Sequence, residues 1–511
     1  MSLRKAFVLA SSLLLLALPA SSRLGAPSRT ERLADAITEI DLARAEKLLA
    51  ASGADSPALA FEGARLSVYR GDCALAAVTL SRPELSETKE GAGLKELADS
   101  CARATAAGAI VEDKARGLWL RVQDDADLAL APFLFDVAAR ARDAVSHAVG
   151  VDLPRPLRID LVRDLFSLSA VSGLPLSAAE TTGTLAVARW GRVILLSPRA
   201  ASQGFPWEDT LAHEITHLMV TRATRDHAPL WLQEGMAKRL EGSWRAPRPF
   251  DEPEWADALA FRAQLEGRSV GIDRLGPSIA MLPTPEAASI AFAEVTSFVS
   301  YFVREAGEPA LRLLFADLKG SGEHGADVAL RSVTGYTLSE WNQRWQRALT
   351  PARGPAEGGS NHGHGAGRDL SRRVRLSDLL FARGEARAAA DEIAPSVGPD
   401  QREPAIRWRA ARALLDAGER EQGAAALGAL TEISSVHGPW FGVRGSVLRE
   451  QHDEGAAEQA FRIGIAVDPL AEDAACEGKR APRGEKSAAA PLPADPARKA
   501  LCVAARARPR D

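Results

Sequence analysis

The chain has few residues of several chemically distinctive types, and each shortage narrows what the protein can be. Its 511 residues include nine histidines, four cysteines and three tyrosines. The net charge is -4, with positive and negative residues mixed along the chain, so nothing indicates a basic surface for nucleic acid. Beyond the first 22 residues, no segment has the roughly 20 consecutive apolar residues of a membrane-spanning helix. We therefore expect no nucleic-acid partner and no transmembrane anchor in the mature chain.

The first 22 residues have the three-part pattern of a secretory signal peptide. Arg4 and Lys5 supply the positive charges, residues 6–18 form a short apolar run, and small residues follow at positions 20–22. The apolar run is too short to cross a bilayer, and no cysteine lies close enough to indicate a lipoprotein. These features predict export, to the periplasm or outside the cell.

The four cysteines fall into two groups that are far apart in the sequence. Cys73 and Cys101 lie in the N-terminal region, whereas Cys476 and Cys502 lie near the C-terminus. In an exported protein this grouping predicts one local disulfide in each region, and four free thiols are the alternative. None of them is close in sequence to the histidine motif described below.

The first two thirds of the chain are predicted to form an all-helical region and then one α+β domain. Apolar residues recur at helical spacing over residues 30–110, and the α+β domain is expected to span residues 113–350. A helix is expected at residues 130–149, and the second half of the domain, from residue 259 to 349, is predicted to be helical. Strands, the last two joined as a hairpin, are predicted at residues 118–122, 157–162, 184–188 and 193–197. The alternation in 157–162 is typical of a half-buried strand.

An internal repeat follows the α+β domain. The glycines in residues 379–385 and 413–419, Gly384 and Gly418, are 34 positions apart, and a looser third copy has Gly455 at its turn. Paired helices with this period resemble tetratricopeptide repeats, which stack to share a core.

Two further segments complete this part of the chain. Residues 351–370, rich in glycine, proline and alanine, are predicted to be a flexible linker ahead of repeats at 371–475. The remaining residues, 476–511, are rich in alanine, proline and arginine and are predicted to be a disordered tail.

The segment from His213 to His217 carries the most specific chemistry. Its HExxH pattern places two imidazoles one helical turn apart on one face, where both can bind one zinc ion, and places Glu214 between them as a general base. Glu234, 17 residues further on, would supply a third ligand from its own helix and leave a fourth position open. The alternative is a surface helix with three incidental polar residues.

Two segments together, residues 209–217 and 229–235, resemble the gluzincin zinc metallopeptidases. They are similar to the bacterial peptidase MA-like domains and more distantly to thermolysin and the zinc aminopeptidases. The resemblance covers roughly residues 113–350 and implies a small sheet, an HExxH helix and a helical C-terminal half, here flanked by all-α regions. It also implies Zn²⁺ as the cofactor and peptide-bond hydrolysis as the reaction. The implied ligands are His213, His217 and Glu234, and the implied base is Glu214.

The resemblance leaves the group that stabilises the oxyanion unassigned. Relatives use a tyrosine or a histidine, and many have a tyrosine where this chain has Phe292. His227 and Tyr301 are the candidates here, each with a packing or surface role as the alternative. Asp209 and Glu241 are candidates to hold the ligand histidines by hydrogen bonds. Their alternatives are a helix N-cap for Asp209 and a solvated charge for Glu241.

The leading hypothesis is an exported zinc metallopeptidase that acts on a peptide or protein substrate. Its helical repeats would recruit or orient a protein partner. The competing hypothesis is a non-catalytic zinc-binding envelope interaction or scaffold protein that acts through those repeats. The two differ in whether Glu214 is needed, because a purely structural zinc site has no use for a base or for an open coordination position.

Overall fold

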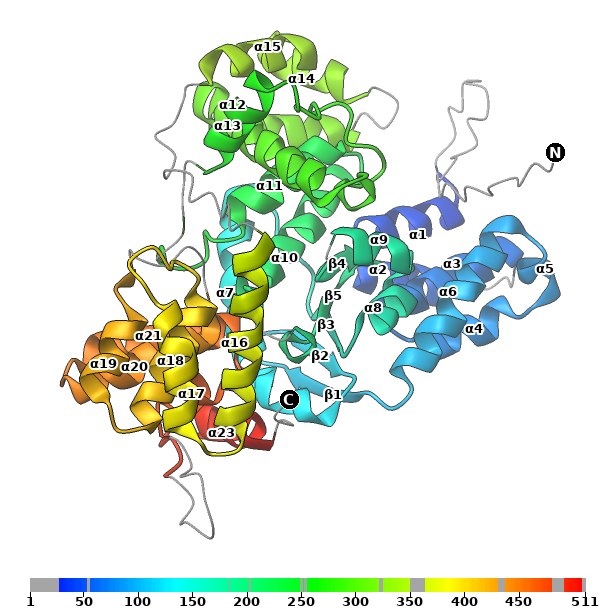
Figure 1. Ribbon diagram of the computed structural model, residues 1–511. Helices are drawn as coiled ribbons and strands as arrows, with labels where there is room; N and C mark the ends of the chain where they lie inside the picture. The colour runs from blue at the N-terminus through cyan, green and yellow to red at the C-terminus, as the bar shows by residue number, and fades with distance from the viewer. Residues whose placement is uncertain are drawn as a thin grey trace, which may run out of the picture.

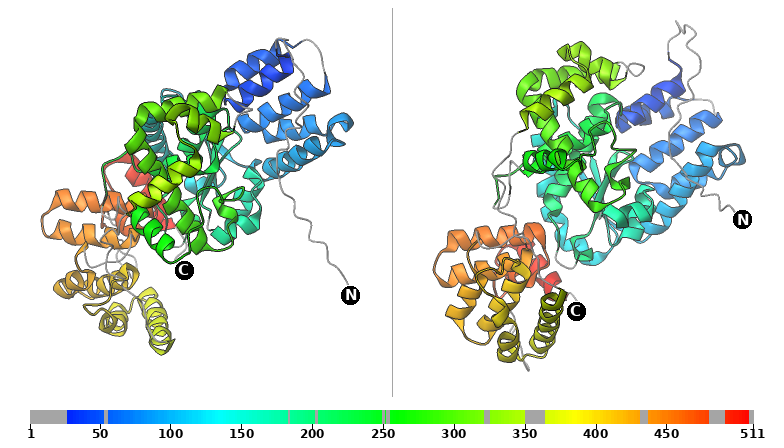
Figure 2. Two further views of the ribbon diagram at one scale, coloured as in Figure 1. Left: turned by 90° about the horizontal axis from the view of Figure 1, so that it is seen from above. Right: turned by 45° about the horizontal axis from the view of Figure 1, so that its top comes forward.

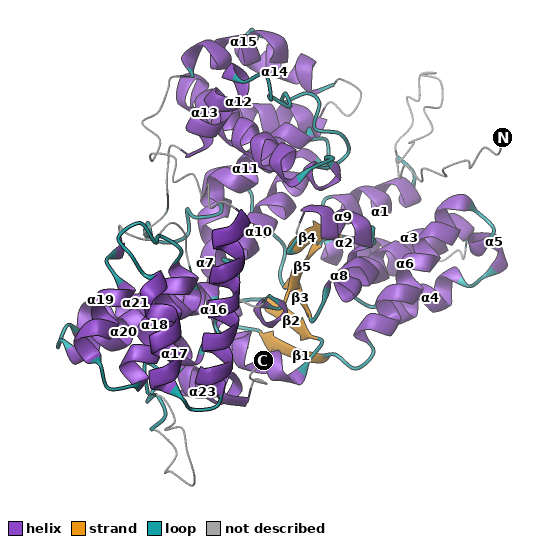
Figure 3. Ribbon diagram, viewed as in Figure 1, coloured by secondary structure: helices purple, strands orange, loops and turns teal. Residues whose placement is uncertain are grey.

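The structure of the protein is a computed structural model that describes residues 27–507 apart from a few short gaps (Figure 1). The gaps are residues 53–55, 183, 202–203, 249–250, 252–254, 321–324, 350–363, 431–436 and 480–490. The expected signal peptide and most of the expected linker lie outside the described residues. Within them the fold is α+β, as expected, with one five-stranded sheet among many helices (Figure 3).

The N-terminal region is helical, as the periodicity predicts, but it ends earlier than expected. The helices in its described residues are α1 (Arg29–Thr38), α2 (Leu42–Ala50), α3 (Pro57–Arg70), α4 (Cys73–Leu80), α5 (Pro83–Ser86) and α6 (Lys89–Thr105). The turn between α3 and α4 needs a left-handed residue, and Gly71 supplies it with φ 81°. The first strand, β1 (Ala109–Asp113), follows directly, so the last residues of the expected helical region belong to the sheet.

The sheet has the strand order β1-β2-β3-β5-β4. The strands after β1 are β2 (Leu118–Val122), β3 (Leu157–Val162), β4 (Ala186–Arg189) and β5 (Arg192–Leu196). β2, β3 and β5 run parallel, while β1 and β4 are antiparallel edge strands. β4 and β5 form the expected hairpin, and the predicted strands 118–122 and 157–162 match β2 and β3 residue for residue.

Both faces of the sheet are covered, which corrects the expectation of a half-buried β3. Ile159 and Leu161 face the main core with α7 (Ala131–Val149) and α10 (Trp207–Thr224). Asp160 and Val162 face the other side, which the N-terminal helices and α8 (Leu165–Ser172) cover. Asp160 is the polar residue in the alternating pattern, and it is buried because Arg121 and Arg192 neutralise its charge.

The second half of the α+β domain is helical, as predicted. After α9 (Leu176–Thr182) and the hairpin come α10, α11 (Leu230–Leu240), α12 (Trp255–Leu265), α13 (Pro285–Gly320), α14 (Ala326–Thr334) and α15 (Leu338–Ala348). The long α13 is two helices joined at Gly307, which has φ 84°. Trp231 of α11 and Trp345 of α15 pack edge-on against Phe298 of α13, which joins these helices into one core.

Among its described residues, the C-terminal region contains three antiparallel helix pairs, and it lies on the side of the central domain opposite the N-terminal helices (Figure 2). The pairs are α16 (His364–Ala382) with α17 (Ala386–Ile393), α18 (Pro404–Asp416) with α19 (Arg420–Leu427), and α20 (Gly438–Glu450) with α21 (Glu454–Val467). Because α16 begins at His364, residues 364–370 are helical, and their assignment to the linker was wrong.

The repeat has a third turn, but not at Gly455. Gly384 and Gly418 both have left-handed backbones, with φ 84° and 86°. The residue 34 positions after Gly418 is His452, which also has a positive φ, 64°. Gly455 lies inside α21. The third copy therefore keeps the backbone of the turn with a residue other than glycine.

The expected disordered tail is partly ordered, which corrects the prediction for residues 476–511. Cys476, just after α22 (Glu472–Ala475), forms a disulfide with Cys502 of α23 (Pro496–Ala507). Leu501 and Ala505 of α23 are buried in the main core of the central domain. The second predicted disulfide, Cys73–Cys101, is present as well. Across the described ranges, no helix has the length and apolarity needed to cross a membrane.

Both flanking regions contact the ends of α10. At its N-terminal end, Trp207 is buried and its indole N–H donates to the Ile465 carbonyl at 3.2 Å. At its C-terminal end, Arg222 donates to the Glu39 carbonyl at 2.6 Å, and Arg225 forms an ion pair with the Glu39 carboxylate. The helix that carries the histidine motif is thus held by residues from both ends of the chain.

Candidate metal and catalytic site

The two histidines of the motif lie midway along α10, the helix that the sequence predicts there. Leu211, Ile215 and Leu218 form a buried apolar stripe against α7 and the sheet, so the helix is fixed in rotation about its axis. The opposite face directs His213 and His217 towards α11. α11 begins after Pro229, whose fixed φ suits a helix start, and it carries Glu234.

The three expected ligands come together around one point. His213 Nε2 and His217 Nε2 are 3.2 Å apart, and Glu234 Oε2 lies 3.6 Å from the first and 3.5 Å from the second. Among the described residues, these three form the one group of histidine, cysteine and acidic side chains placed to hold a metal ion. The sequence-predicted ligand set is therefore also a spatial cluster.

Each histidine is oriented by a second contact through its other ring nitrogen. His213 Nδ1 lies 3.1 Å from Glu241 Oε2, and His217 Nδ1 lies 3.1 Å from Gln233 Oε1. Both partners are on or next to α11, and Lys238 forms an ion pair with Glu241 at 3.0 Å. Of the two carboxylates proposed for this role, Glu241 has it. Gln233 was not predicted, although its position beside Glu234 could have indicated it.

Asp209 does not contact the histidines. It lies in the first turn of α10, where its carboxylate accepts two hydrogen bonds from Arg245, at 2.7 and 2.6 Å. The helix N-cap is Pro206, so the alternative role as N-cap is also wrong. Asp209 instead joins the start of α10 to the segment after α11.

Glu214 is buried beside the ligands and faces the edge of the sheet. Burial raises the pKa of its carboxyl group, the positive histidines oppose this shift, and the negative Glu234 adds to it. The backbone N–H of Ala188 in β4 also donates to this carboxylate and favours the charged form. A carboxyl group with a raised pKa, next to a cluster of possible metal ligands, is suited to taking and returning a proton.

The cluster is electrostatically suited to a cation. Burial lowers the pKa of the His213 imidazole, but hydrogen bonds to Glu234 and Glu241 outweigh it and raise the pKa to about 9. The pKa of Glu234 is held far below its usual value because the two histidines more than offset its burial. Three carboxylates, those of Glu214, Glu234 and Glu241, surround the imidazoles and stabilise positive charge there.

The two candidates for the oxyanion group have other contacts. Tyr301 packs edge-on against Trp341 of α15, with Arg304 over its ring. His227 is exposed, and its Nδ1 lies 3.0 Å from the Leu318 carbonyl at the end of α13. In the described structure neither side chain has a contact with the three ligands or with Glu214. Phe292 lies 5.5 Å from the Lys238 ammonium, on the side of α11 that carries Glu241.

Gly235, directly after the ligand Glu234, allows α11 to approach α13 closely. A Cβ atom on Gly235 would lie 2.6 Å from the Val295 carbonyl oxygen and would also clash with the Val299 side chain. No larger residue fits without moving α11. The glycine of the WLQEG segment thus has a packing role that holds the third ligand near the first two.

The domain combines a small mixed sheet, a buried HExxH helix and a second helix whose carboxylate faces both histidines. Residues 146–351 match the family model of the Peptidase MA superfamily, a match that covers less than half of the chain but includes α10, α11 and the helical half. Comparison with curated proteins and with solved structures gives no match. The matched segment supports a peptidase-like hydrolase with a peptide or protein substrate.

Proposed function

We propose that the protein is a zinc-dependent peptidase of the gluzincin type. The observation that carries this proposal is the spacing of the three ligand atoms. Zinc binds nitrogen and carboxylate oxygen at about 2.0–2.2 Å in a tetrahedron, whose edges are then about 3.3–3.6 Å. The three separations of 3.2, 3.5 and 3.6 Å lie close to that range. The residues therefore fit the metal.

The protonation of the imidazoles supports the same assignment. Glu241 and the Gln233 carbonyl oxygen are acceptors, so each histidine would donate from Nδ1 and keep an unprotonated Nε2 when a metal is bound. Two Nε2 lone pairs would then point at one place, which is unfavourable unless a cation lies between them.

The chain's own residues can carry out the proton transfers of peptide hydrolysis. Zinc, when bound, would lower the pKa of a water to near 7 and polarise the scissile carbonyl. Glu214 would take a proton from the attacking water at its carboxylate and deliver it to the leaving amine. Burial raises the pKa of this group, which favours its holding the proton between the two transfers.

The free edge of β4 offers a place for an extended substrate. Leu196 donates to the Leu185 carbonyl, so alternate residues of β4 bond to β5, and the backbone groups of Ala186 and Ala188 face away from the sheet. The N–H of Ala188 already reaches Glu214. A peptide added along this edge would therefore lie directly over the base and the ligands.

The setting of this activity is also part of the proposal. Export is supported by the signal-like N-terminus and by two formed disulfides, which persist in oxidising compartments. The C-terminal helix pairs, with left-handed turns 34 residues apart at Gly384, Gly418 and His452, are proposed to be tetratricopeptide-like repeats that recruit a protein partner.

Metal analysis combined with a peptide-library digest tests the function. Purified protein should contain about one zinc per chain and cleave a subset of the library. A chelator should abolish cleavage, and added zinc should restore it. Metal-free protein that gains no zinc on titration, with His213 and His217 intact, would contradict the proposal.

The Glu241 contact predicts a measurable effect on metal affinity. Glu241→Gln should weaken zinc binding about 10- to 100-fold, because His213 loses the charged acceptor that orients it. Competition with a chromophoric chelator measures this change directly. Glu305→Gln, at an exposed site on α13, is the matched control and should leave the affinity unchanged. Equal affinities for the two variants would show that Glu241 has no role.

A further inference from the structure

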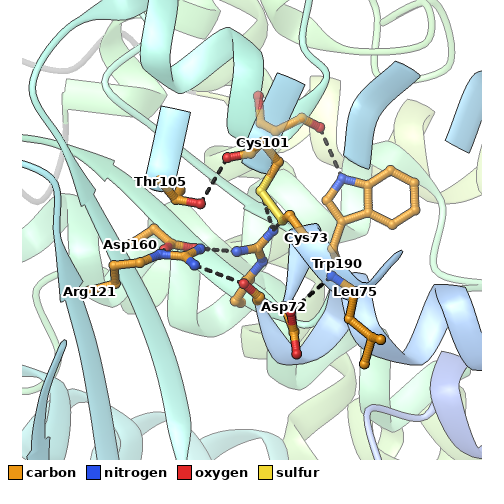
Figure 4. The surroundings of a disulfide bond; sticks show 11 residues. Asp72, Cys73, Leu75, Cys101, Thr105, Arg121, Asp160 and Trp190 are labelled. Atoms are coloured by element: carbon orange, nitrogen blue, oxygen red, sulfur yellow. Dashed lines mark hydrogen bonds and ion pairs between the residues drawn. A yellow bond between two sulfur atoms is a disulfide. The ribbon is translucent and has the colours of Figure 1, made fainter. Parts of the chain in front are cut away.

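Two arginines and one aspartate lie together on the face of the sheet that the N-terminal helices cover, beside the Cys73–Cys101 disulfide (Figure 4). Asp160 in β3 accepts from Arg121 Nε at 2.6 Å and from Arg192 Nη1 at 2.5 Å. Arg192 is fully buried, and Asp160 and Arg121 are nearly so. Two guanidinium groups therefore share one carboxylate away from water, which leaves one positive charge in excess.

The excess charge faces the disulfide. Arg192 Nη2 donates towards Cys73 Sγ at 3.7 Å and towards Cys101 Sγ at 3.6 Å. A disulfide sulfur is a weak, neutral acceptor, so this contact does little to compensate the charge. Arg192 Nε and Arg121 Nη2 also have no hydrogen-bond partner among the described residues. The apolar residues packed with the two cysteines include Val162 and Ile194.

We propose that Cys73 and Cys101 form a redox-responsive pair, whose reduced state is stabilised by Arg192 as a Cys73 thiolate. Because both cysteines are buried, reduction requires α4 and α6 to separate locally; a dithiol reductant would then attack Cys101 Sγ, and Cys73 would leave as the thiolate. The second thiol of the reductant would then displace Cys101, which takes one proton. The reductant gives up two electrons and two protons and becomes a disulfide, and the second proton goes to solvent.

The position of each cysteine supports this assignment. Cys73 is the first residue of α4, where the N–H groups of the helix start favour a negative charge, whereas Cys101 lies inside α6. The charged groups near the pair include Arg192, Arg121 and Asp160 from the sheet and Asp72 at the N-cap of α4. Arg158 of β3 also lies within electrostatic range of Arg192. Asp72 opposes a thiolate, but it is exposed and screened by water, whereas Arg192 is not.

Opening this disulfide would change how the N-terminal helices hold the hairpin. The bond joins α4 to α6 directly over Arg192, the first residue of β5. The same hairpin is held at its turn by Trp190, which donates to the Ser172 carbonyl and packs against Tyr69 of α3. β4, whose Ala188 reaches Glu214, is the other strand of that hairpin. Reduction would therefore alter the position of β4, the strand that contacts Glu214 beside the proposed metal ligands.

The second disulfide is an internal control. Cys476–Cys502 closes a loop of nearly the same length, with sequence separations of 26 and 28, so the two bonds constrain the unfolded chain to similar degrees. The contact of Cys476 Sγ is with the Cys502 carbonyl rather than with a cation. A difference in reducibility between the two pairs is therefore attributable to their native surroundings.

A redox titration of the wild-type protein tests the proposal without reference to metal binding or peptide cleavage. The protein is equilibrated with mixtures of reduced and oxidised dithiothreitol, approached from both redox states, and its thiols are trapped and quantified by peptide mass spectrometry. At about pH 9.5, where a thiol with the ordinary pKa of about 8.5 is mostly ionised, Cys73–Cys101 should be half open at a reduced-to-oxidised ratio about tenfold lower than Cys476–Cys502, the effect of a one-unit fall in thiol pKa under these conditions. Equal midpoints, or an earlier opening of Cys476–Cys502, would overturn the proposal.

Titration of the reduced protein supplies a second readout. Thiolate absorbance should give a step well below the ordinary cysteine pKa of about 8.5. Cys73→Ser should remove this step, Cys101→Ser should keep it, and Arg192→Met should move it upwards. Arg192→Lys, which keeps a cation, should retain part of the effect. A step that stays at about 8.5 or above in the wild type contradicts the thiolate assignment even if Arg192→Met fails to fold.

Discussion

Replacing Glu214 by glutamine should lower the rate of peptide hydrolysis by about 10²- to 10⁴-fold, the range for a positioned general base. The amide has nearly the shape of the carboxylate but cannot take the proton of the attacking water. Because Glu214 supplies none of the three clustered ligand atoms, the variant should contain as much zinc as the wild type. The measurement is initial rates on a peptide found in the library digest, with metal content determined on the same samples.

His217→Ala is the companion variant for this experiment. It removes one of the three ligand atoms, so both zinc and activity should be lost. Loss of activity with zinc retained in Glu214→Gln, and loss of both in His217→Ala, separates the base from the ligands. If Glu214→Gln cleaves as fast as the wild type, Glu214 is not the base, and the scaffold hypothesis becomes the better one.

Asp160→Asn should lower the free energy of unfolding by about 3–5 kcal/mol, because it removes the charge that two buried guanidinium groups share. Arg121 and Arg192 would then face each other across strands without a counter-ion. Denaturant unfolding, monitored at constant pH, measures the change. Asparagine has nearly the same volume as aspartate, so the decrease in the free energy of unfolding measures the effect of removing the charge.

Asp136→Asn is the matched control for that measurement. Asp136 pairs with Arg140 one turn along α7, and both side chains are about half exposed, at 57% and 52%. Such surface pairs contribute about 0–1 kcal/mol, so this variant should unfold almost as the wild type does. If Asp160→Asn costs no more than Asp136→Asn, the buried cluster is not held together by charge.

The parts of the fold that could be predicted were those in which local sequence decides the outcome. β2 is a short, mostly apolar run and β3 alternates apolar and polar residues, and the limits of both strands matched the prediction. β1 was missed because it follows α6 after only a few residues and its strand character depends on pairing with β2. The burial of Asp160 also could not be read from its own strand. It requires the strand order that places Arg121 directly opposite and Arg192 nearby.

The candidate site shows the same division. The ligand spacing and Glu214 follow from helical geometry, so the sequence was sufficient to predict their proximity. Gln233 was missed because its contact with His217 depends on how α10 and α11 cross. Asp209 was a poor candidate for the same reason, since its true partner, Arg245, is 36 residues away.

The C-terminal errors arose from composition and from reliance on glycine. Residues 476–511 have the composition of a disordered tail, yet Leu501 and Ala505 lie one helical turn apart and reach the main core. The third repeat turn was placed at a glycine, whereas the backbone there is left-handed at His452. The 34-residue period therefore predicted the position of the third turn better than the presence of a glycine did.

The contact between Trp207 and Ile465 has a consequence for the order in which the protein can mature. The two residues are separated by 258 positions, so Ile465 is synthesised long after the histidine motif. The start of α10 therefore gains its contact with Ile465 only after most of the polypeptide has been synthesised. Long-range contacts of this kind slow folding, because the intervening chain must be ordered first. We therefore expect the site of the proposed peptidase to be complete only after these distant segments have folded.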